Sequence, residues 1–284
     1  MPDTLHRADL VVRHGSVVDG TGAPRFPADV AVSSGKIVAV GQLEDVEARE
    51  ELDASGLVVS PGFIDLHSHG DLILAWPSEQ RLVLLEGRLA QGITTEIVGN
   101  CGLGAAPLFG DGPSLLPEIN GWMSPERFAW SWRGLGDYFS HLERLGLPLN
   151  VGALVPHGPI RLGAMGLISG EPQTASLSTM ESELDASLDA GDLGLSAGLI
   201  YPPGMYTATD ELVFLARRVS RTGGLFTCHV RGSSETLLLA VGELLDISRR
   251  AEVHVHHSHA EAVGRSHWGK LEKFLENEEA ARRD

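Results

Sequence analysis

Histidine and cysteine side chains fall near the ends of apolar segments, where they could hold a metal ion together. Two histidines form an H-x-H motif, one cysteine follows a Gly-Asn pair, and three further histidines close two later apolar runs. These residues are His67, His69, Cys101, His229, His257 and His259. Imidazole and thiolate are donors that zinc prefers. Because zinc with an open coordination position activates water and polarises an amide carbonyl, the set points to a metal-dependent hydrolase.

The elements that must position these side chains alternate between strands and helices. From about residue 61, six apolar strand patterns are each followed by a helical pattern. The strands are expected near 63–67, 94–99, 150–155, 193–198, 225–230 and 252–259, and the helices near 78–92, 136–146, 177–191, 209–224, 233–250 and 267–283. Serial alternation indicates parallel strands buried on both faces, in an open sheet or in a (β/α)8 barrel.

The placement of the polar residues favours the barrel. An open nucleotide-binding sheet would carry a glycine-rich phosphate loop, and no such motif occurs. In a barrel, functional residues come from the carboxyl ends of several strands, where these histidines and Cys101 are expected. We therefore expect an α/β fold of the TIM-barrel type over residues 61–284, incomplete, with about six of the eight strand-helix units. Residues 1–60 are expected to form a small antiparallel β-layer, a partial β-sandwich.

Strand alternation predicts where individual side chains point. Successive side chains point to opposite faces, so His67 and His69 are expected together on the interior side. The same rule places Cys228 on the helix side, as core packing. His257 shares the parity of His259 and is expected one layer deeper, as a core histidine, a supporting histidine or a further ligand.

Four other features have more than one interpretation. Arg231 either meets a substrate carboxylate or forms an ordinary salt bridge. Tyr201 precedes two prolines and either contacts substrate or packs its loop. A loop over 103–136 carries three tryptophans, which either line an acyl pocket or only anchor the loop. Ser196 lies in G-x-S-x-G, the nucleophile elbow of serine hydrolases, but the prolines that follow delay the helix that this motif requires.

Composition excludes several other classes of protein. The chain has 38 acidic against 22 basic residues and a formal net charge of −16, which argues against binding nucleic acid or anionic membranes. No apolar run approaches the roughly 20 residues that cross a bilayer. Two cysteines make no disulfide framework, and the N-terminal segment lacks a secretory signal pattern. The expected location is the cytoplasm.

Several motifs resemble those of metal-dependent amidohydrolases. The segments GSVVDGTG, GKIVAVG and SPGFIDLHSHGD resemble that family's N-terminal β-layer, first barrel strand and H-x-H motif. More narrowly, GITTEIVGNCGLGAAP, GLIYPPG, CHVR and HSHAEAVG resemble, in order and spacing, the D-aminoacylases, which are N-acyl-D-amino-acid deacylases. The resemblance runs over nearly the whole chain.

The resemblance implies a substrate and a ligand set. The substrate would be a small N-acyl amino acid or a related amide, hydrolysed with the help of one or two zinc ions. Tyr201 matches a tyrosine that lines the family's substrate site. The implied metal ligands are His67, His69, Cys101, His229 and His259.

Two departures from the family pattern concern activity. The D-aminoacylases have a lysine two residues after the strand-six histidine, where it reaches the substrate carboxylate, whereas this chain has Glu261. The family's catalytic aspartate ends strand eight, and this sequence stops at Asp284, about one helix after strand six. No catalytic residue is therefore assigned within the chain.

These departures lead to a further expectation and to two alternative functions. We expect a fragment or one piece of a split enzyme, which a complementary C-terminal chain or a homo-oligomer would complete. The main alternative is a non-catalytic remnant, and the lesser one is a serine hydrolase that uses Ser196.

Overall fold

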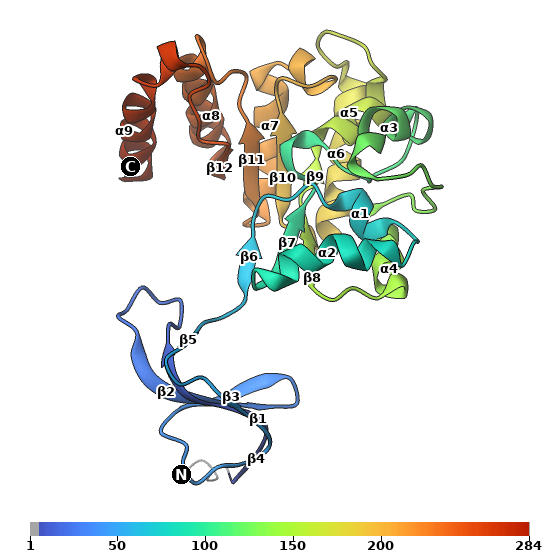
Figure 1. The fold of residues 1–284 in the computed structure, drawn as a ribbon. Coiled ribbons are helices and arrows are strands. Elements are labelled where there is room, and N and C mark those ends of the chain that lie inside the picture. Colours follow the sequence, from blue (N-terminus) through green and yellow to red (C-terminus); the bar gives the residue numbers. More distant parts are fainter. Residues whose placement is uncertain (1–5, 284) are drawn as a thin grey trace. The chain divides into compact units, whose positions relative to one another are not determined.

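The computed structural model describes residues 6–283 and divides into two compact units, Met1–Phe63 and Ile64–Asp284 (Figure 1). The first unit is a five-stranded sheet with the order β3-β2-β1-β4, in which β5 also pairs with β1. Its strands are β1 (Arg7–Val17), β2 (Phe26–Ser33), β3 (Lys36–Gly41), β4 (Glu47–Asp53) and β5 (Val58–Val59).

The first unit is a mixed sheet, so the expectation of an antiparallel layer was only partly right. β2 runs antiparallel to β1 and β3 runs antiparallel to β2, but β4 and β5 both run parallel to β1. The parallel pairing arises because the segment 42–46 carries the chain from β3, beyond β2, to the opposite side of β1. Local turn signals do not reveal a crossing of this kind.

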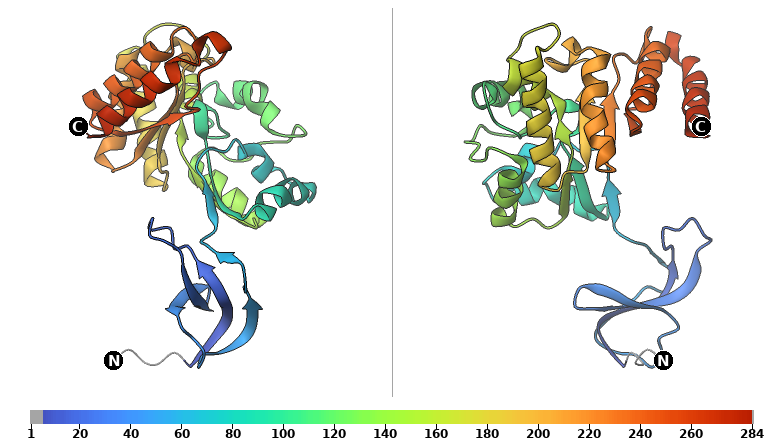
Figure 2. Two further views of the ribbon diagram at one scale, coloured as in Figure 1. Left: turned by 60° about the vertical axis from the view of Figure 1, so that its left-hand side comes forward. Right: turned by 180° about the vertical axis from the view of Figure 1, so that it is seen from behind.

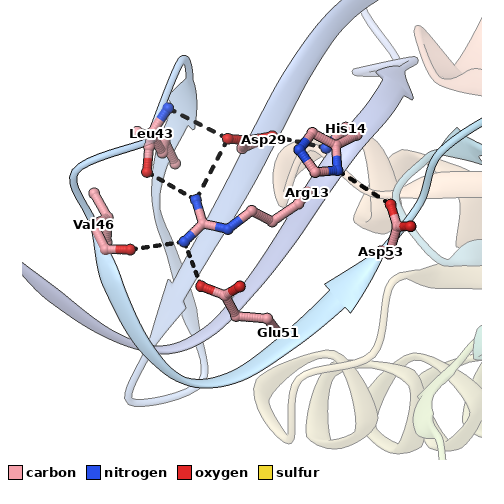
Figure 3. Close-up of polar contacts among 7 residues, drawn as sticks. All are labelled: Arg13, His14, Asp29, Leu43, Val46, Glu51 and Asp53. Carbon is pink, nitrogen blue, oxygen red and sulfur yellow. Dashed lines mark hydrogen bonds and ion pairs between the residues drawn. The ribbon is translucent and has the colours of Figure 1, made fainter.

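A polar cluster around Arg13 holds this crossing segment (Figure 3). The Arg13 guanidinium donates hydrogen bonds to the carbonyl oxygens of Leu43 and Val46, each at 2.8 Å, and forms an ion pair with Glu51. Asp29 lies 3.6 Å from the same guanidinium and accepts a hydrogen bond from the Leu43 amide at 3.4 Å. One side chain therefore ties β1 to both ends of the crossing segment and to β4.

The second unit contains parallel strands in chain order. The strands are β6 (Phe63–Asp65), β7 (Ile93–Val98), β8 (Asn150–Ala153), β9 (Val155–Pro156), β10 (Gly194–Gly198), β11 (Leu225–His229) and β12 (His254–Ser258). They form the paths β6-β7-β8 and β9-β10-β11-β12, and β8 and β9 are separated only by Leu154. Pairing is parallel between β7 and β8, β9 and β10, β10 and β11, and β11 and β12.

Helices follow the strands and cover one face of them. The helices are α1 (Asp71–Ala75), α2 (Gln80–Ala90), α3 (Gly112–Asn120), α4 (Leu135–Leu145), α5 (His157–Met165), α6 (Thr174–Asp189), α7 (Thr209–Arg221), α8 (Leu237–Ala251) and α9 (Lys270–Arg283). All six helices expected from the sequence are confirmed, as α2, α4, α6, α7, α8 and α9. Figure 2 shows α6, α7, α8 and α9 in succession along one side of the unit.

β10 is buried along its whole length. The helices α5 and α7 pack against it, and so does the turn over Asn100–Gly102 that follows β7. Cys228 belongs to the main core cluster of the unit, as expected for a residue that faces the helices. Leu212, Leu215 and Val219 of α7 also belong to this cluster.

The strands form open sheets and not a closed barrel. Within residues 6–283, β6 and β12 each pair on one side only, and they do not pair with each other. Ile64 and Leu66, in and just after β6, are more than half exposed. The observed architecture is therefore an α/β fold with an arc of parallel strands. No helix in the described part of the chain is long and apolar enough to span a membrane.

Asp192 provides a test of this packing. It precedes β10, and both of its carboxyl oxygens are buried without a hydrogen-bond partner. Burial raises the pKa of this carboxyl from its ordinary 3.8 to about 8. The folded protein therefore keeps a proton that the unfolded chain has lost between about pH 4 and pH 8, so the free energy of unfolding falls as the pH rises through this range.

Asp192→Asn is expected to remove this dependence, because the amide cannot ionise. In urea unfolding, the variant should gain stability over the wild type as the pH increases from 5 to 8, by at least ~1 kcal/mol at pH 8. Asp189→Asn, which removes an exposed carboxylate at the end of α6, is the control and should change little. Parallel pH profiles for Asp192→Asn and the wild type would contradict the prediction.

Candidate metal centre

The Cys101 thiol lies at the meeting point of several strand ends. Its Sγ atom is 3.2 Å from His259 Nε2, 3.4 Å from His67 Nε2 and 3.8 Å from His229 Nδ1. The ligand atoms of His67, Cys101 and His259 all lie within 4.8 Å of one another. Residues that are 34, 128 and 158 positions from Cys101 thus converge on one sulfur atom.

A tight turn after β7 presents this sulfur. Residues Asn100–Gly102 form a short 3-10 turn, η1, in which Cys101 has the left-handed backbone angles φ 55° and ψ 27°. The turn packs backbone against backbone: a side-chain carbon at Gly99 would lie 2.2 Å from the Leu154 carbonyl oxygen, and one at Gly198 would lie 2.0 Å from the Cys101 carbonyl oxygen. Only glycine fits at these two contacts.

His67 and His69 lie in the turn that follows β6 and not in the strand itself. The strand ends at Asp65, whose carboxylate accepts a hydrogen bond from the His67 amide at 3.1 Å. The two imidazole rings nevertheless lie edge to face with centroids 5.3 Å apart, and the His67 ring is 4.4 Å from that of His259. The alternation argument therefore placed His67 and His69 at the end of a strand, whereas they follow it, but the two rings do lie close together as expected.

The two later histidines approach from the opposite end of the strand arc. His229 is the last residue of β11 and is buried. His259 directly follows β12 with a φ of 56°, and its ring centroid is 4.8 Å from that of His229. All five candidate ligands named from the sequence are thus brought to one place, although His69 is linked to the sulfur only through the His67 ring.

His257 is a core histidine, as one interpretation predicted, but it does not point toward the other candidate ligands. His257 pairs in register with Cys228 and faces the helices, and its Nδ1 atom is 2.6 Å from Glu278 of α9. The parity argument failed because β12 ends at Ser258, so the left-handed residue His259 no longer follows the alternation of the strand.

Burial favours the uncharged forms of three of the histidines and of the Cys101 thiol. It lowers the pKa values of His67 and His229 to about 4, with a further contribution from the nearby His259. Burial, and to a smaller extent His259, also lower the pKa of His69. The pKa of the Cys101 thiol moves the other way, to about 12, because burial disfavours the thiolate. A divalent cation would compensate that thiolate, which is the form of cysteine that binds metals.

The spacing of the donors fits a zinc ion. With zinc–sulfur and zinc–nitrogen bonds of about 2.3 and 2.0–2.1 Å at tetrahedral angles, sulfur and nitrogen lie about 3.5 Å apart. The three sulfur–nitrogen distances at Cys101, from 3.2 to 3.8 Å, bracket that value. His69 Nδ1 is buried without a hydrogen-bond partner, so it is also available as a donor.

The other site residues named from the sequence are placed differently. The Tyr201 ring lies 5.2 Å from that of His229, and Glu261 is exposed and close enough to contribute to a raised pKa of the Tyr201 hydroxyl, after burial and Cys101. The Arg231 guanidinium is occupied elsewhere: it forms an ion pair with Glu243 at 3.0 Å and donates to two loop carbonyls. These contacts match the salt-bridge interpretation of Arg231.

Ser196 has no access to a substrate. Its side chain is fully buried, and its hydroxyl donates to the Gly99 carbonyl and accepts a hydrogen bond from the Gly102 amide at 3.0 Å. A nucleophilic serine needs an exposed hydroxyl at a strand-to-helix turn. The serine-hydrolase alternative is therefore contradicted by this burial.

The tryptophans of the long loop divide between the two interpretations given above. Trp132 is buried, donates to the Ala105 carbonyl at 2.7 Å and stacks on Trp130, so this pair anchors the loop. Trp122 is 64% exposed, and its ring lies 6.2 Å from that of His69. Trp122 alone of the three is therefore positioned beside the cluster.

Sequence reasoning missed the residues that support the Cys101 turn. The buried Asp71 carboxylate accepts a hydrogen bond from the Gly99 amide at 2.9 Å. The Asn100 amide donates to the carbonyl oxygens of Ile97 at 2.9 Å and Leu66 at 3.3 Å, and so joins β7 to the turn after β6. Their positions in the sequence could have pointed to them, because each is a polar residue within two residues of a candidate ligand.

Comparisons with known proteins agree with this fold. The model of the Amidohydrolase family matches residues 50–175. An N-acyl-D-glutamate deacylase from Alcaligenes xylosoxydans xylosoxydans is 37% identical over 278 residues, which are 97% of this chain and 54% of that protein. A D-aminoacylase from the same organism is 32% identical over 277 residues, 96% of this chain and 54% of that protein. The chain thus spans about half the length of these relatives.

A solved structure is similar to this chain in both fold and sequence. The N-acyl-D-glutamate deacylase from Bordetella bronchiseptica, complexed with zinc and a phosphonate inhibitor, matches with a TM-score of 0.86 and 36% identity, over 98% of this chain and 56% of that one. The fold of this chain is that of these amidohydrolase structures, and residues 50–175 match the Amidohydrolase family model. These matches, which run over nearly the whole chain, are to an N-acyl-D-glutamate deacylase and to D-aminoacylases.

Proposed function

We propose that this chain forms the zinc-binding part of an N-acyl-D-amino-acid deacylase. The observation that carries the proposal is the convergence of three imidazole nitrogens on the Cys101 sulfur at distances suited to zinc. The proposed ligands are His67, His69, Cys101, His229 and His259, for one or two ions. Zinc, when bound, would supply a Lewis acid that polarises an amide carbonyl and makes water acidic enough to react near neutral pH.

The residues of the chain itself would bind and orient the substrate. Trp122, exposed beside His69, supplies an apolar surface for an acyl group, and Tyr201 beside His229 supplies a hydroxyl on the other side of the cluster. Among the proposed donors, Cys101 and His229 are buried, His67 and His69 are half-buried, and His259 is exposed, so the site opens to solvent on the His259 side. We assign no proton-transfer residue among residues 6–283.

We further infer that the arc of strands is part of a (β/α)8 barrel. Two features support this inference: the one-sided pairing of β6 and β12, and the match of this chain to about half of its relatives. The remaining strand-helix units, with the family's catalytic aspartate, would come from polypeptide outside this sequence. A complementary chain is the proposed partner.

Metal binding tests the ligand set directly. The purified chain should retain zinc after dialysis, as measured by elemental analysis, and Cys101→Ala or His259→Ala should weaken its zinc affinity by ~10–100-fold or more, because each removes a donor. Cys228→Ala is the matched control, since that thiol is equally buried but faces the helices. A wild-type chain without zinc affinity, or an equal loss in Cys228→Ala, would refute the proposed site.

Glu261 tests the substrate class. Its carboxylate lies near Tyr201, where it would repel the carboxylate of an N-acyl amino acid. Glu261→Lys should therefore tighten the binding of N-acetyl-D-glutamate to the zinc-loaded chain by roughly 3–10-fold, measured by calorimetry, because an exposed charge contributes at most about 1 kcal/mol. Glu272→Lys on α9 makes the same change in net charge and should leave binding unchanged. Equal effects of both substitutions would contradict a local role for Glu261.

Turnover distinguishes an enzyme from a non-catalytic remnant. The zinc-loaded chain is incubated with N-acetyl-D-glutamate and with a neutral N-acetyl-D-amino acid, alone and with a polypeptide that carries the last strand-helix units of a D-aminoacylase. We expect free amino acid only in the presence of the second polypeptide, which brings the aspartate. Release by the chain alone would contradict complementation. No release in either case, with zinc bound, would favour the non-catalytic alternative.

A further inference from the structure

The Cys101 turn has a conformation that needs support from outside the turn. Cys101 is one of five non-glycine residues with positive φ in the described part of the chain. The left-handed backbone is sterically unfavourable for a residue with a side chain, because its Cβ crowds the following carbonyl oxygen. The close contacts of Gly99 and Gly198 permit the turn to approach its neighbours. Hydrogen bonds to the backbone groups at its two ends hold it in place.

The Ser196 hydroxyl supplies those hydrogen bonds at both ends of the turn. It donates to the carbonyl of Gly99, the residue before the turn, and accepts from the amide of Gly102, the last residue of the turn, at 3.0 Å. A hydroxyl has one proton to donate, and here it is used within the protein. Ser196 lies in the middle of β10, and its side chain is fully buried, so water does not compete for these contacts.

We propose that Ser196 is a positioning residue for the Cys101 thiolate: its hydroxyl fixes both ends of the Gly99–Gly102 turn so that Sγ faces the three imidazoles. This inference rests on the proposed zinc site. Loss of the hydroxyl leaves a buried carbonyl and a buried amide without hydrogen-bond partners, which is unfavourable for each group. Rotation of the turn relieves that cost and moves the sulfur away from the other donors.

Cobalt(II) is the probe, because a thiolate bound to cobalt gives a near-ultraviolet charge-transfer absorption that imidazole ligands do not give. The wild-type chain with cobalt should show this absorption. Ser196→Ala should still bind cobalt, through the histidines, but with less than half of the charge-transfer intensity and with an affinity at least ~10-fold weaker. A full-intensity band in a folded Ser196→Ala chain would overturn the positioning role.

Thr227→Val is the matched control for the loss of a buried hydroxyl. Thr227 pairs in register with Ser196 on β11, is as deeply buried, and its hydroxyl has no hydrogen-bond partner. This variant should keep the charge-transfer band at full intensity. An equal loss of the band in Thr227→Val would show a general effect of the core and would overturn the specific role of Ser196.

A second pair of variants covers the case in which Ser196→Ala does not fold, as judged by circular dichroism. Ser196→Thr and Ser196→Val have the same shape and differ only in the hydroxyl, so the extra methyl group affects both. The band should be stronger in Ser196→Thr than in Ser196→Val, and equal bands would overturn the proposal. If the wild-type chain itself binds cobalt without the band, the failure lies in the proposed thiolate ligand and not in Ser196.

Discussion

The interlocked turn at Cys101 is the constraint on which the rest of the site depends. Its carbonyl oxygen fits against Gly198 of β10, and Gly99 fits against the Leu154 carbonyl between β8 and β9, at contacts that exclude any side chain. The Ser196 hydroxyl donates to the Gly99 carbonyl and accepts from the Gly102 amide, and the Asp71 carboxylate accepts from the Gly99 amide. Because these contacts join the ends of neighbouring strands, they fix the point to which donors from β6, β11 and β12 must reach.

Burial disfavours the charged forms of the side chains around the Cys101 sulfur while no cation is bound there. The same burial that lowers the pKa values of His67 and His229 raises that of Cys101, so neutral imidazoles face a neutral thiol. Neutral imidazole is already the form that binds metal, whereas the thiol must lose a proton. A cation with affinity for sulfur would compensate the thiolate in this desolvated position, and zinc has that affinity.

Much of this arrangement follows from local patterns, and the failures have physical causes. Alternation of strands and helices predicted all six long helices, and the residue types identified the cluster of donors. Three details did not follow: the crossing of segment 42–46, the orientation of His257, and the left-handed residues Cys101 and His259. Each depends on where a strand ends or on contacts distant in sequence, and period-two alternation carries no information about either. The role of Ser196 was hidden for the same reason, since its partners are 94 and 97 residues away.

The central claim is that the Cys101 sulfur and the surrounding imidazoles bind one zinc ion together. X-ray absorption at the zinc edge, on the zinc-loaded chain, measures the atoms around the metal directly. The account predicts one sulfur at about 2.3 Å together with nitrogen or oxygen neighbours at about 2.0–2.1 Å for that ion, so that two bound ions would halve the average sulfur count. A shell of nitrogen and oxygen alone, with no sulfur, would contradict it.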